Sequence, residues 1–184
     1  MKSLTVFAGI GTLALGASAA SSAVISLGGP LSRMCYESAL DRDARDAAID
    51  GCTRSLDEEA LDPKDRAATL VNRGILHMVH GSASSADADF DSALAMDAHL
   101  SDAWLNKGFL RLRRGDGRDA LPLLQKGIDF APHRQALAIF ARGVAYEQMG
   151  EYSLAYADLK RAHDLEPGWA LPSEYLANYR LVGR

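Results

Sequence analysis

Six positions of this chain recur at intervals of 34 or 35 residues, and this spacing constrains the fold more than any other feature. In the clearest copy they hold Trp104, Gly108, Ala120, Leu124, Gly127 and Pro132. The copy that lies 34 residues earlier holds Leu70, Gly74, Ala86, Phe90, Ala93 and Ala98. The copy that lies 35 residues later holds Ile139, Gly143, Ala155, Leu159, Ala162 and Pro167. A period of this length, built on small residues, is typical of helical repeats.

These residues resemble the tetratricopeptide repeat (TPR), a helix-turn-helix unit that binds other proteins. The resemblance implies an all-α helical-repeat solenoid with degenerate leading helices. The expected solenoid has full repeats at about 67–100, 101–135 and 136–170 and a capping helix at 171–182. Apolar periodicity predicts the first helices at 64–80, 101–114 and 134–149, and the second helices at 85–96, 118–130 and 152–165. Each first helix is expected to end at a glycine, namely Gly81, Gly115 and Gly150.

Small residues recur inside both helices of each predicted repeat. The first helices contain Gly74, Gly108 and Gly143. Each glycine would destabilise an isolated helix by about 1 kcal/mol relative to alanine, so its recurrence indicates close helix packing. The small residues expected opposite them in the second helices are Ala86, Ala120 and Ala155. Pro132 and Pro167 are expected to end two second helices.

The first nineteen residues have the pattern of a secretory signal. Lys2 precedes an apolar stretch at residues 4–16, and Ala17-Ser18-Ala19 matches the small residues before a cleavage site. We therefore predict a signal peptide at residues 1–19. The protein is then exported, to the periplasm of a bacterium, and has no membrane span after cleavage.

An uncleaved membrane anchor is the alternative, because no charged residue stands between Lys2 and Arg33. Cleavage is favoured because residues 17–26 are mostly alanine and serine, which are weakly apolar. The mature chain is expected to have a flexible N-terminus at 20–34 and a repeat domain at 35–184.

Cys35 and Cys52 are the only cysteines. Their spacing fits neither a CxxC redox motif nor a zinc site with four ligands, so in an exported protein we expect a structural disulfide. On the loop-entropy account it would stabilise the fold by about 3 kcal/mol. Residues 48–53, Ala-Ile-Asp-Gly-Cys-Thr, resemble a stretch of exported bacterial repeat proteins. This resemblance implies a disulfide-stapled leading half repeat, whose helix is predicted at 43–56.

Charge and motifs argue against most other functions. The chain has 20 Lys and Arg against 24 Asp and Glu, with the signs interspersed, so it offers no basic stripe to nucleic acid. It contains no HExxH, GxSxG, Walker or GxGxxG motif. The sequence therefore predicts no enzyme, no cofactor and no nucleic-acid partner.

Two groups of polar residues could suggest a metal site. His77 and His80 share a helix face, but a packing role is favoured because two imidazoles without further ligands make a weak site. Asp87, Asp89 and Asp91 alternate along a predicted helix and lack the glycine and glutamate of a calcium loop. We interpret these aspartates as a solvated face.

A cation stands just before the interior glycine of each first helix, namely Arg73, Lys107 and Arg142. Sixteen residues after the two arginines stand Asp89 and Asp158, whereas Leu123 follows the lysine at that distance. Antiparallel packing of the two helices would bring such positions together. We therefore predict ion pairs Arg73–Asp89 and Arg142–Asp158; the alternative is that each charge is solvated separately.

The first helices also carry a stripe, spaced i, i+4, i+7, that the repeat geometry turns toward the concave side of the stack. The stripe consists of Val71, Ile75, Met78, Leu105, Phe109, Leu112, Phe140, Val144 and Glu147. Its rim holds Asn72, Asn106, Arg113 and Gln148. Eight of the nine stripe residues are apolar, which predicts a groove for an amphipathic helix or an apolar peptide. The alternative is that neighbouring first helices bury the stripe against each other.

Some TPR proteins hold the terminal carboxylate of a peptide with paired asparagine and basic residues. Asn72 and Asn106 match the asparagines, but Ala68, Leu137 and Ala141 replace the basic residues. A desolvated carboxylate without a cation would bind poorly, so this clamp is not expected.

Three functions are compatible with these features. The favoured one is a non-catalytic interaction module that binds a protein or peptide segment in the concave groove, within the cell envelope. The second is a structural or dimerisation component, including a homodimer, that braces an envelope complex. The third is a small metal-dependent or hydrolytic enzyme, which the absence of any nucleophile beside a base disfavours.

Overall fold

The computed structural model describes residues 23–25, 28–131 and 135–179, and within these residues it contains helices and turns but no strand. The helices are α1 (Pro30–Asp41), α2 (Asp46–Glu58), α3 (Pro63–His80), α4 (Ala83–Met96), α5 (Ser101–Leu112), α6 (Gly117–Phe130), α7 (Gln135–Gln148), α8 (Tyr152–Leu165) and α9 (Ala170–Leu176). The six helices predicted for the three repeats are confirmed as α3 to α8. The fold is an all-α solenoid of TPR type.

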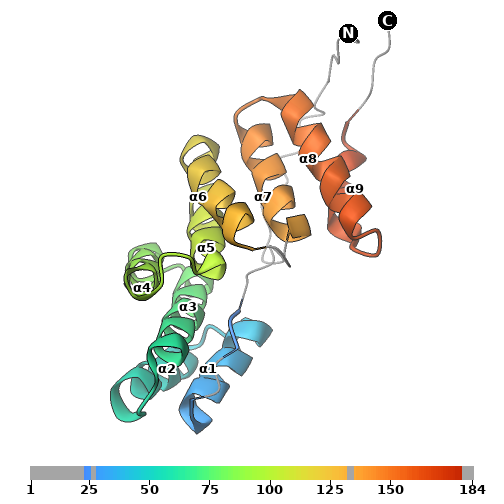
Figure 1. Ribbon diagram of the computed structural model, residues 1–184. Coiled ribbons are helices and arrows are strands. Elements are labelled where there is room, and N and C mark those ends of the chain that lie inside the picture. The colour runs from blue at the N-terminus through green and yellow to red at the C-terminus, as the bar shows by residue number, and fades with distance from the viewer. Residues whose placement is uncertain (1–22, 26–27, 132–134, 180–184) are drawn as a thin grey trace, which may run out of the picture.

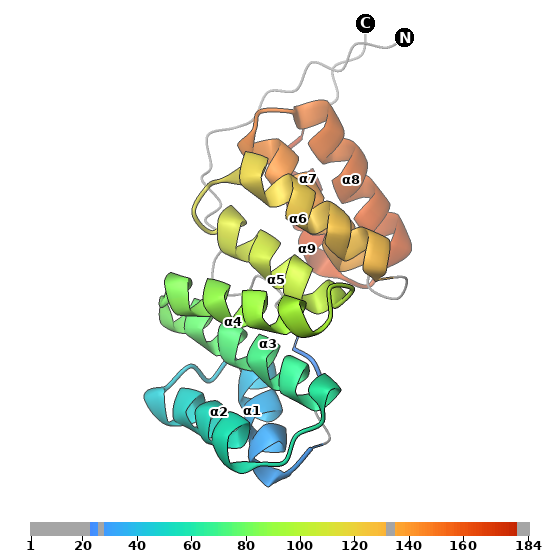
Figure 2. The same ribbon diagram turned by 60° about the vertical axis from the view of Figure 1, so that its left-hand side comes forward.

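The helices form hairpins that stack in chain order (Figure 1). α3 packs against α4, α5 against α6 and α7 against α8. In addition, α3 contacts α5 and α5 contacts α7, so the first helices of the three repeats form a continuous layer. Figure 2 shows α4 and α6 together on one side of this layer. The opposite side of the layer is the predicted concave face.

Each interior glycine of a first helix lies against a large side chain of the second helix. A side chain at Gly74 or Gly108 would overlap that neighbour, so both positions require glycine. The three pairs are Gly74 with Phe90, Gly108 with Leu124 and Gly143 with Leu159. The expected close approach is present, but the nearest side chain is the large residue four positions after the alanine. Ala86, Ala120 and Ala155 are fully buried beside these contacts.

The predicted turns and ends are largely present. Gly81, Gly115 and Gly150 have φ of 96°, 82° and 76°, the left-handed conformation that ends a helix and favours glycine. Pro167 follows the end of α8, whereas Pro132 lies outside the described residues. α9 lies where the capping helix was expected, and the end of the predicted cap at 180–182 is outside the described residues.

Trp104 of α5 is half-buried and contacts the turn after α4 and a side chain of α6. Its indole Nε1 donates a hydrogen bond of 2.9 Å to the backbone oxygen of Ala98, which follows α4. The ammonium of Lys126 on α6 lies 3.9 Å from the centroid of its ring. The repeat position that Trp104 occupies in α5 is therefore a packing position.

The N-terminal end differs from the prediction, because the leading unit is a whole hairpin, α1 and α2, rather than a half repeat. α1 begins at Pro30, inside the stretch expected to be flexible. Glu59 explains this difference: its carboxylate accepts hydrogen bonds of 2.8 and 2.9 Å from the N–H groups of Leu31 and Ser32. These N–H groups have no partner inside the helix, so Glu59 caps α1. A cap supplied 28 residues away leaves no local pattern in the sequence.

Within the described ranges, no helix is long and apolar enough to cross a membrane. The predicted signal peptide at residues 1–19 lies outside those ranges.

Candidate functional site

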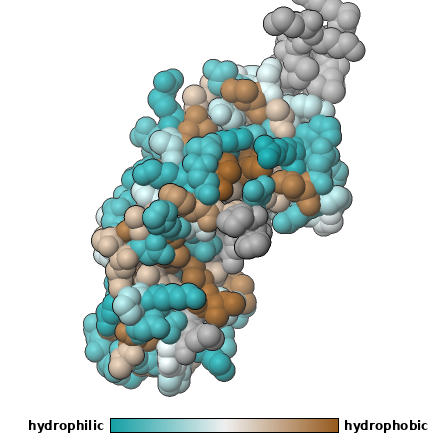
Figure 3. All heavy atoms as spheres, viewed as in Figure 1, coloured by the Kyte–Doolittle hydropathy of each residue, from teal (hydrophilic) through white to brown (hydrophobic). Residues whose placement is uncertain are grey.

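The eight apolar residues of the predicted groove stripe are packed inside the described structure. None of them is more than 4% exposed: Val71, Ile75, Met78, Leu105, Phe109, Leu112, Phe140 and Val144. On the face shown in Figure 3, the uncovered apolar residues form separate patches among hydrophilic ones. The stripe is thus not open to solvent in this conformation, and its role in partner binding stays a prediction.

Several different parts of the chain cover this stripe. In the middle, the first helices cover one another, because α5 contacts both α3 and α7. At the C-terminal end, the ring of Phe140 packs against Trp169 and Tyr175, with centroids 5.0 and 5.1 Å apart. At the N-terminal end, α1 contacts α3, and Val24 is hydrogen-bonded to Asn72 of α3. Segments outside the three repeats therefore occupy both ends of the face.

Asn72 is fully buried and holds the backbone of Val24 at two points. Its side-chain oxygen accepts a hydrogen bond of 2.9 Å from the Val24 N–H, and its amide nitrogen donates one of 2.7 Å to the Val24 carbonyl oxygen. Asn106 occupies the equivalent position of α5, and its amide nitrogen donates to the backbone oxygen of Asp102. The sequence singled out Asn72, but it gave no indication that residues 23–25 would be its partner.

The rim of the face carries charged and polar groups. Arg113 is exposed at the end of α5, and Gln148 donates a hydrogen bond of 2.9 Å to the backbone oxygen of Leu112, linking α7 to α5. Burial, together with the nearby Arg113 guanidinium, lowers the pKa of Arg42. Two arginines from different hairpins therefore approach each other here.

Glu147 is the one charged member of the stripe, and it is half-buried near the C-terminal end. Burial raises the pKa of its carboxyl, against the opposing influence of the Tyr179 hydroxyl. Burial and the carboxylate of Glu147 also raise the pKa of Tyr179 well above its ordinary value. Burial therefore favours the protonated carboxyl of Glu147, and the Tyr179 hydroxyl favours the ionised one.

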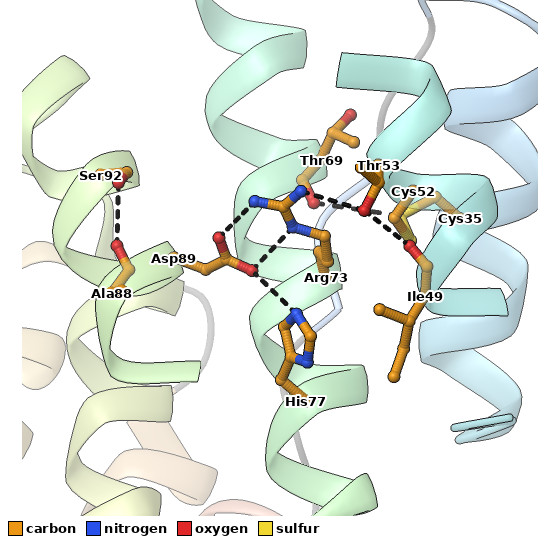
Figure 4. A network of polar contacts seen from close by, with 10 residues as sticks. All are labelled: Cys35, Ile49, Cys52, Thr53, Thr69, Arg73, His77, Ala88, Asp89 and Ser92. Atoms are coloured by element: carbon orange, nitrogen blue, oxygen red, sulfur yellow. Dashed lines mark hydrogen bonds and ion pairs between the residues drawn. A yellow bond between two sulfur atoms is a disulfide. The ribbon is translucent and has the colours of Figure 1, made fainter. Parts of the chain in front are cut away.

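The predicted ion pairs Arg73–Asp89 and Arg142–Asp158 are both confirmed, and each is bidentate. Arg73 donates to the two oxygens of Asp89 at 2.9 and 2.7 Å, and Arg142 to those of Asp158 at 2.7 and 2.9 Å. Figure 4 shows that Arg73 also reaches α2, where its third nitrogen donates 3.1 Å to the Thr53 hydroxyl. These contacts join two helices of one repeat to the preceding unit.

Lys107 pairs with the preceding hairpin instead, because its own second helix offers Leu123. Its ammonium lies 3.0 Å from Asp87 and also contacts Asp91, both on α4. Arg111 reaches Asp87 at 2.8 Å. The interpretation of Asp87, Asp89 and Asp91 as a solvated face is wrong for Asp89, which is buried in its pair with Arg73, whereas Asp91 stays exposed beside Lys107. Asp87 and Asp91 share one face of α4, where both contact Lys107, and Asp89 lies on another face toward Arg73.

His77 lies beside the Arg73–Asp89 pair, with Nε2 3.9 Å from the Asp89 carboxylate. Burial lowers the pKa of the imidazole, and Asp89 opposes that shift. Among the described residues, no group of three or more His, Cys, Asp or Glu side chains could hold a metal ion. The arrangement around His77 is that of a packing residue.

The Cys35–Cys52 disulfide is present and joins α1 to α2, with Cα atoms 4.9 Å apart. Both cysteines are buried in the core. The bond fits a protein that folds in an oxidising compartment.

Comparison with solved structures places the chain among helical-repeat proteins. One similar structure is a crystal structure of MamA, with a TM-score of 0.62 and 21% identity over 77% of this chain and 80% of that one. Another is MamA from Desulfovibrio magneticus RS-1, with a TM-score of 0.62 and 22% identity over 80% of this chain and 82% of that one. MamA has a TPR fold, and at this identity the likeness shows the fold alone. No family model and no curated protein sequence matches the chain.

Proposed function

We propose that this protein is a non-catalytic adaptor that binds a peptide or partner segment on the concave face of its repeat stack, in the cell envelope. The observation that carries this proposal is the occupation of both ends of the face by segments outside the three repeats. Val24 pairs with Asn72, and Tyr175 of α9 packs on Phe140. A surface that accepts two such different segments has the shape and chemistry to accept a partner, as concave faces of helical repeats do.

The envelope assignment rests on the disulfide together with the N-terminal signal pattern. A buried structural disulfide favours export to an oxidising compartment, and the periplasm is the compartment we propose. The predicted partner is a protein or peptide. No observation favours the bracing role or a homodimer over this one.

Site-specific photo-crosslinking in the native host tests the proposal. A photoreactive residue at Arg113 lies on the rim of the concave face, whereas one at Leu154 lies exposed on the second helix of the third repeat. We expect a discrete partner adduct from the Arg113 position and none from the Leu154 position. Equal adducts from both positions, or an adduct from Leu154 alone, would contradict the concave-face assignment.

A further inference from the structure

The two hydrogen bonds between Asn72 and Val24 recognise a backbone rather than a side chain. The amide oxygen accepts a hydrogen bond from the N–H of Val24, and the amide nitrogen donates one to the carbonyl oxygen of Val24. A neighbouring β-strand would pair with the backbone of a residue in the same way. Asn72 comes from the middle of α3 and is fully buried, so its amide is held in place by packing. Figures 1 and 2 show the blue stretch before α1 on the side of α3 that is turned away from α4. The contact is therefore made on the concave face.

The three residues of this segment differ in how far the face encloses them. Ala23 is 8% exposed and belongs to the hydrophobic core, and Val24 is half-buried against that core. Ile25 is 61% exposed. The face thus encloses the first side chain, partly covers the second and leaves the third in solvent.

We propose that residues 23–25 are a displaceable occupant of the concave face, and that the partner is a peptide segment that takes their place. That segment would lie in the same extended form, pair its backbone with Asn72 and carry an alanine-sized side chain at the position of Ala23. This inference rests on the proposed function and adds the chemistry of the partner and a built-in competitor.

Displacement is physically reasonable because the segment is held only by non-covalent contacts and lies outside the helices. A tethered occupant competes at an effective concentration on the order of mM, so a free peptide with the same contacts binds the native chain weakly. Loosening the occupant raises the fraction of open chains and improves the apparent affinity in proportion. A natural partner must therefore make contacts beyond those of residues 23–25.

The test uses a labelled peptide with the sequence of residues 20–27, Ala-Ser-Ser-Ala-Val-Ile-Ser-Leu, and the full chain as its host processes it. Val24→Pro removes the N–H that Asn72 accepts and leaves the helices intact, which circular dichroism checks. We expect the peptide to bind this variant at least about tenfold more tightly than the native chain. Adding Asn72→Ala to Val24→Pro should abolish binding, whereas adding Asn178→Ala, an exposed asparagine near α9, should not.

Matched changes in the peptide test the same site without altering the protein. Glutamate in place of the residue that corresponds to Ala23 should abolish binding to the Val24→Pro variant, because a charged side chain cannot enter that position. Glutamate in place of the residue that corresponds to Ile25 should leave binding within about twofold, because that side chain stays in solvent.

Several outcomes would overturn the inference. Equal affinity of the native chain and the Val24→Pro variant would show that residues 23–25 do not compete. An equal loss of affinity for both glutamate peptides would show that the site does not distinguish the Ala23 position from the Ile25 position. A native dimer that the peptide dissociates would assign the face to a second copy of this chain. Failure of the peptide with every variant, while the partner still crosslinks at Arg113, would overturn this inference and leave the proposed function standing.

Discussion

The two ends of the repeat stack are closed in different ways. At the N-terminal end, a complete hairpin carries a covalent link, Cys35–Cys52, between its helices. At the C-terminal end, α9 has seven residues and packs through aromatic rings, with Tyr175 and Trp169 against Phe140. Each end of a solenoid must cover a hydrophobic face that has no neighbouring repeat.

The side chains available at each end explain the difference. The buried residues of α1 and α2 are mostly small, and Leu56 is their largest apolar side chain. A small hydrophobic contribution leaves a need for a staple, which the disulfide supplies. The C-terminal cap instead buries large rings, whose apolar area stabilises the contact without a covalent bond. The comparison indicates that one end is held by restricting the unfolded chain and the other by burial.

Removal of the disulfide is expected to have the largest effect. Cys52→Ser should lower the free energy of unfolding by about 3 kcal/mol, because the unfolded chain regains the freedom of the closed loop. Hydrogen exchange should show faster opening of α1 and α2 and little change in α5 to α8. Reductant should reproduce the loss in the native chain and have no further effect on the variant. A variant as stable as the native chain would show that packing alone closes this end.

Truncation of the aromatic cap should have the next largest effect. Tyr175→Ala removes a ring that is 5% exposed and should lower the free energy of unfolding by about 2 kcal/mol. Hydrogen exchange should increase in α9 and around Phe140 in α7 and not in α1 or α2, the reverse of the Cys52→Ser pattern. Leu154→Ala, at an exposed position of α8, is the control and should change little. Loosening of both ends by Tyr175→Ala would contradict independent closure.

Two carboxyls near opposite ends of the stack should respond to pH in opposite directions. Burial opposes ionisation of Glu59, but hydrogen bonds from Ser55, Leu31 and Ser32 outweigh it and lower its pKa. Its stabilisation is therefore present above the unfolded pKa and is lost as pH falls through the lowered folded pKa. Burial raises the pKa of Glu147, so stability is greatest below the unfolded pKa and falls as pH rises through the folded pKa.

Glutamine variants and urea unfolding from pH 7 to about pH 3 measure this contrast. Glu59→Gln should lower the free energy of unfolding by about 1 kcal/mol at pH 7, as the loss of a helix cap does. This difference from the native chain should become smaller as the pH falls. The free energy of unfolding of Glu147→Gln, relative to that of the native chain, should be higher at pH 7 than in acid. If the stability of both variants relative to the native chain changed in the same direction as the pH falls, the assigned pKa directions would be contradicted.

Much of the repeat region could be predicted from the sequence because its interactions are local and periodic. The glycines at 81, 115 and 150, the helix bounds and the pairs Arg73–Asp89 and Arg142–Asp158 all follow from spacing within one hairpin. The contacts that were not predicted join distant segments. Glu59 caps α1, which precedes it in the chain, and Lys107 forms its ion pair with Asp87 of the preceding hairpin.

The concave face shows the same limit. The i, i+4, i+7 pattern identifies side chains that share a helix face, but it cannot distinguish an open groove from a packed layer. That distinction depends on the partners of Asn72 and Phe140, which lie 48 residues earlier in the chain and in α9, respectively. No periodic signal marks residues 23–25, since a backbone-to-amide contact requires no particular side chain at Val24.

The smallest expected effect concerns the two bidentate ion pairs, which have nearly equal geometry and exposure. The arginine side chains are 20% and 19% exposed and the aspartates 8% and 10%. Double-mutant cycles with alanine should therefore give similar couplings, roughly 0.5 to 1 kcal/mol for each pair, because partly exposed pairs contribute little more. Urea unfolding of each single and double variant measures these values.

The third hydrogen bond of each arginine links this small effect to the closure of the ends. Arg73 reaches Thr53 on the stapled helix α2, whereas Arg142 reaches Gln125 on α6 within the repeat block. In the Cys52→Ser background α2 loses its covalent restraint, so Thr53 should no longer hold the Arg73 guanidinium against Asp89. We expect the Arg73–Asp89 coupling to fall by a few tenths of a kcal/mol there and the Arg142–Asp158 coupling to stay constant. A parallel fall in both couplings would mean that the disulfide stabilises the whole stack rather than the end that contains it.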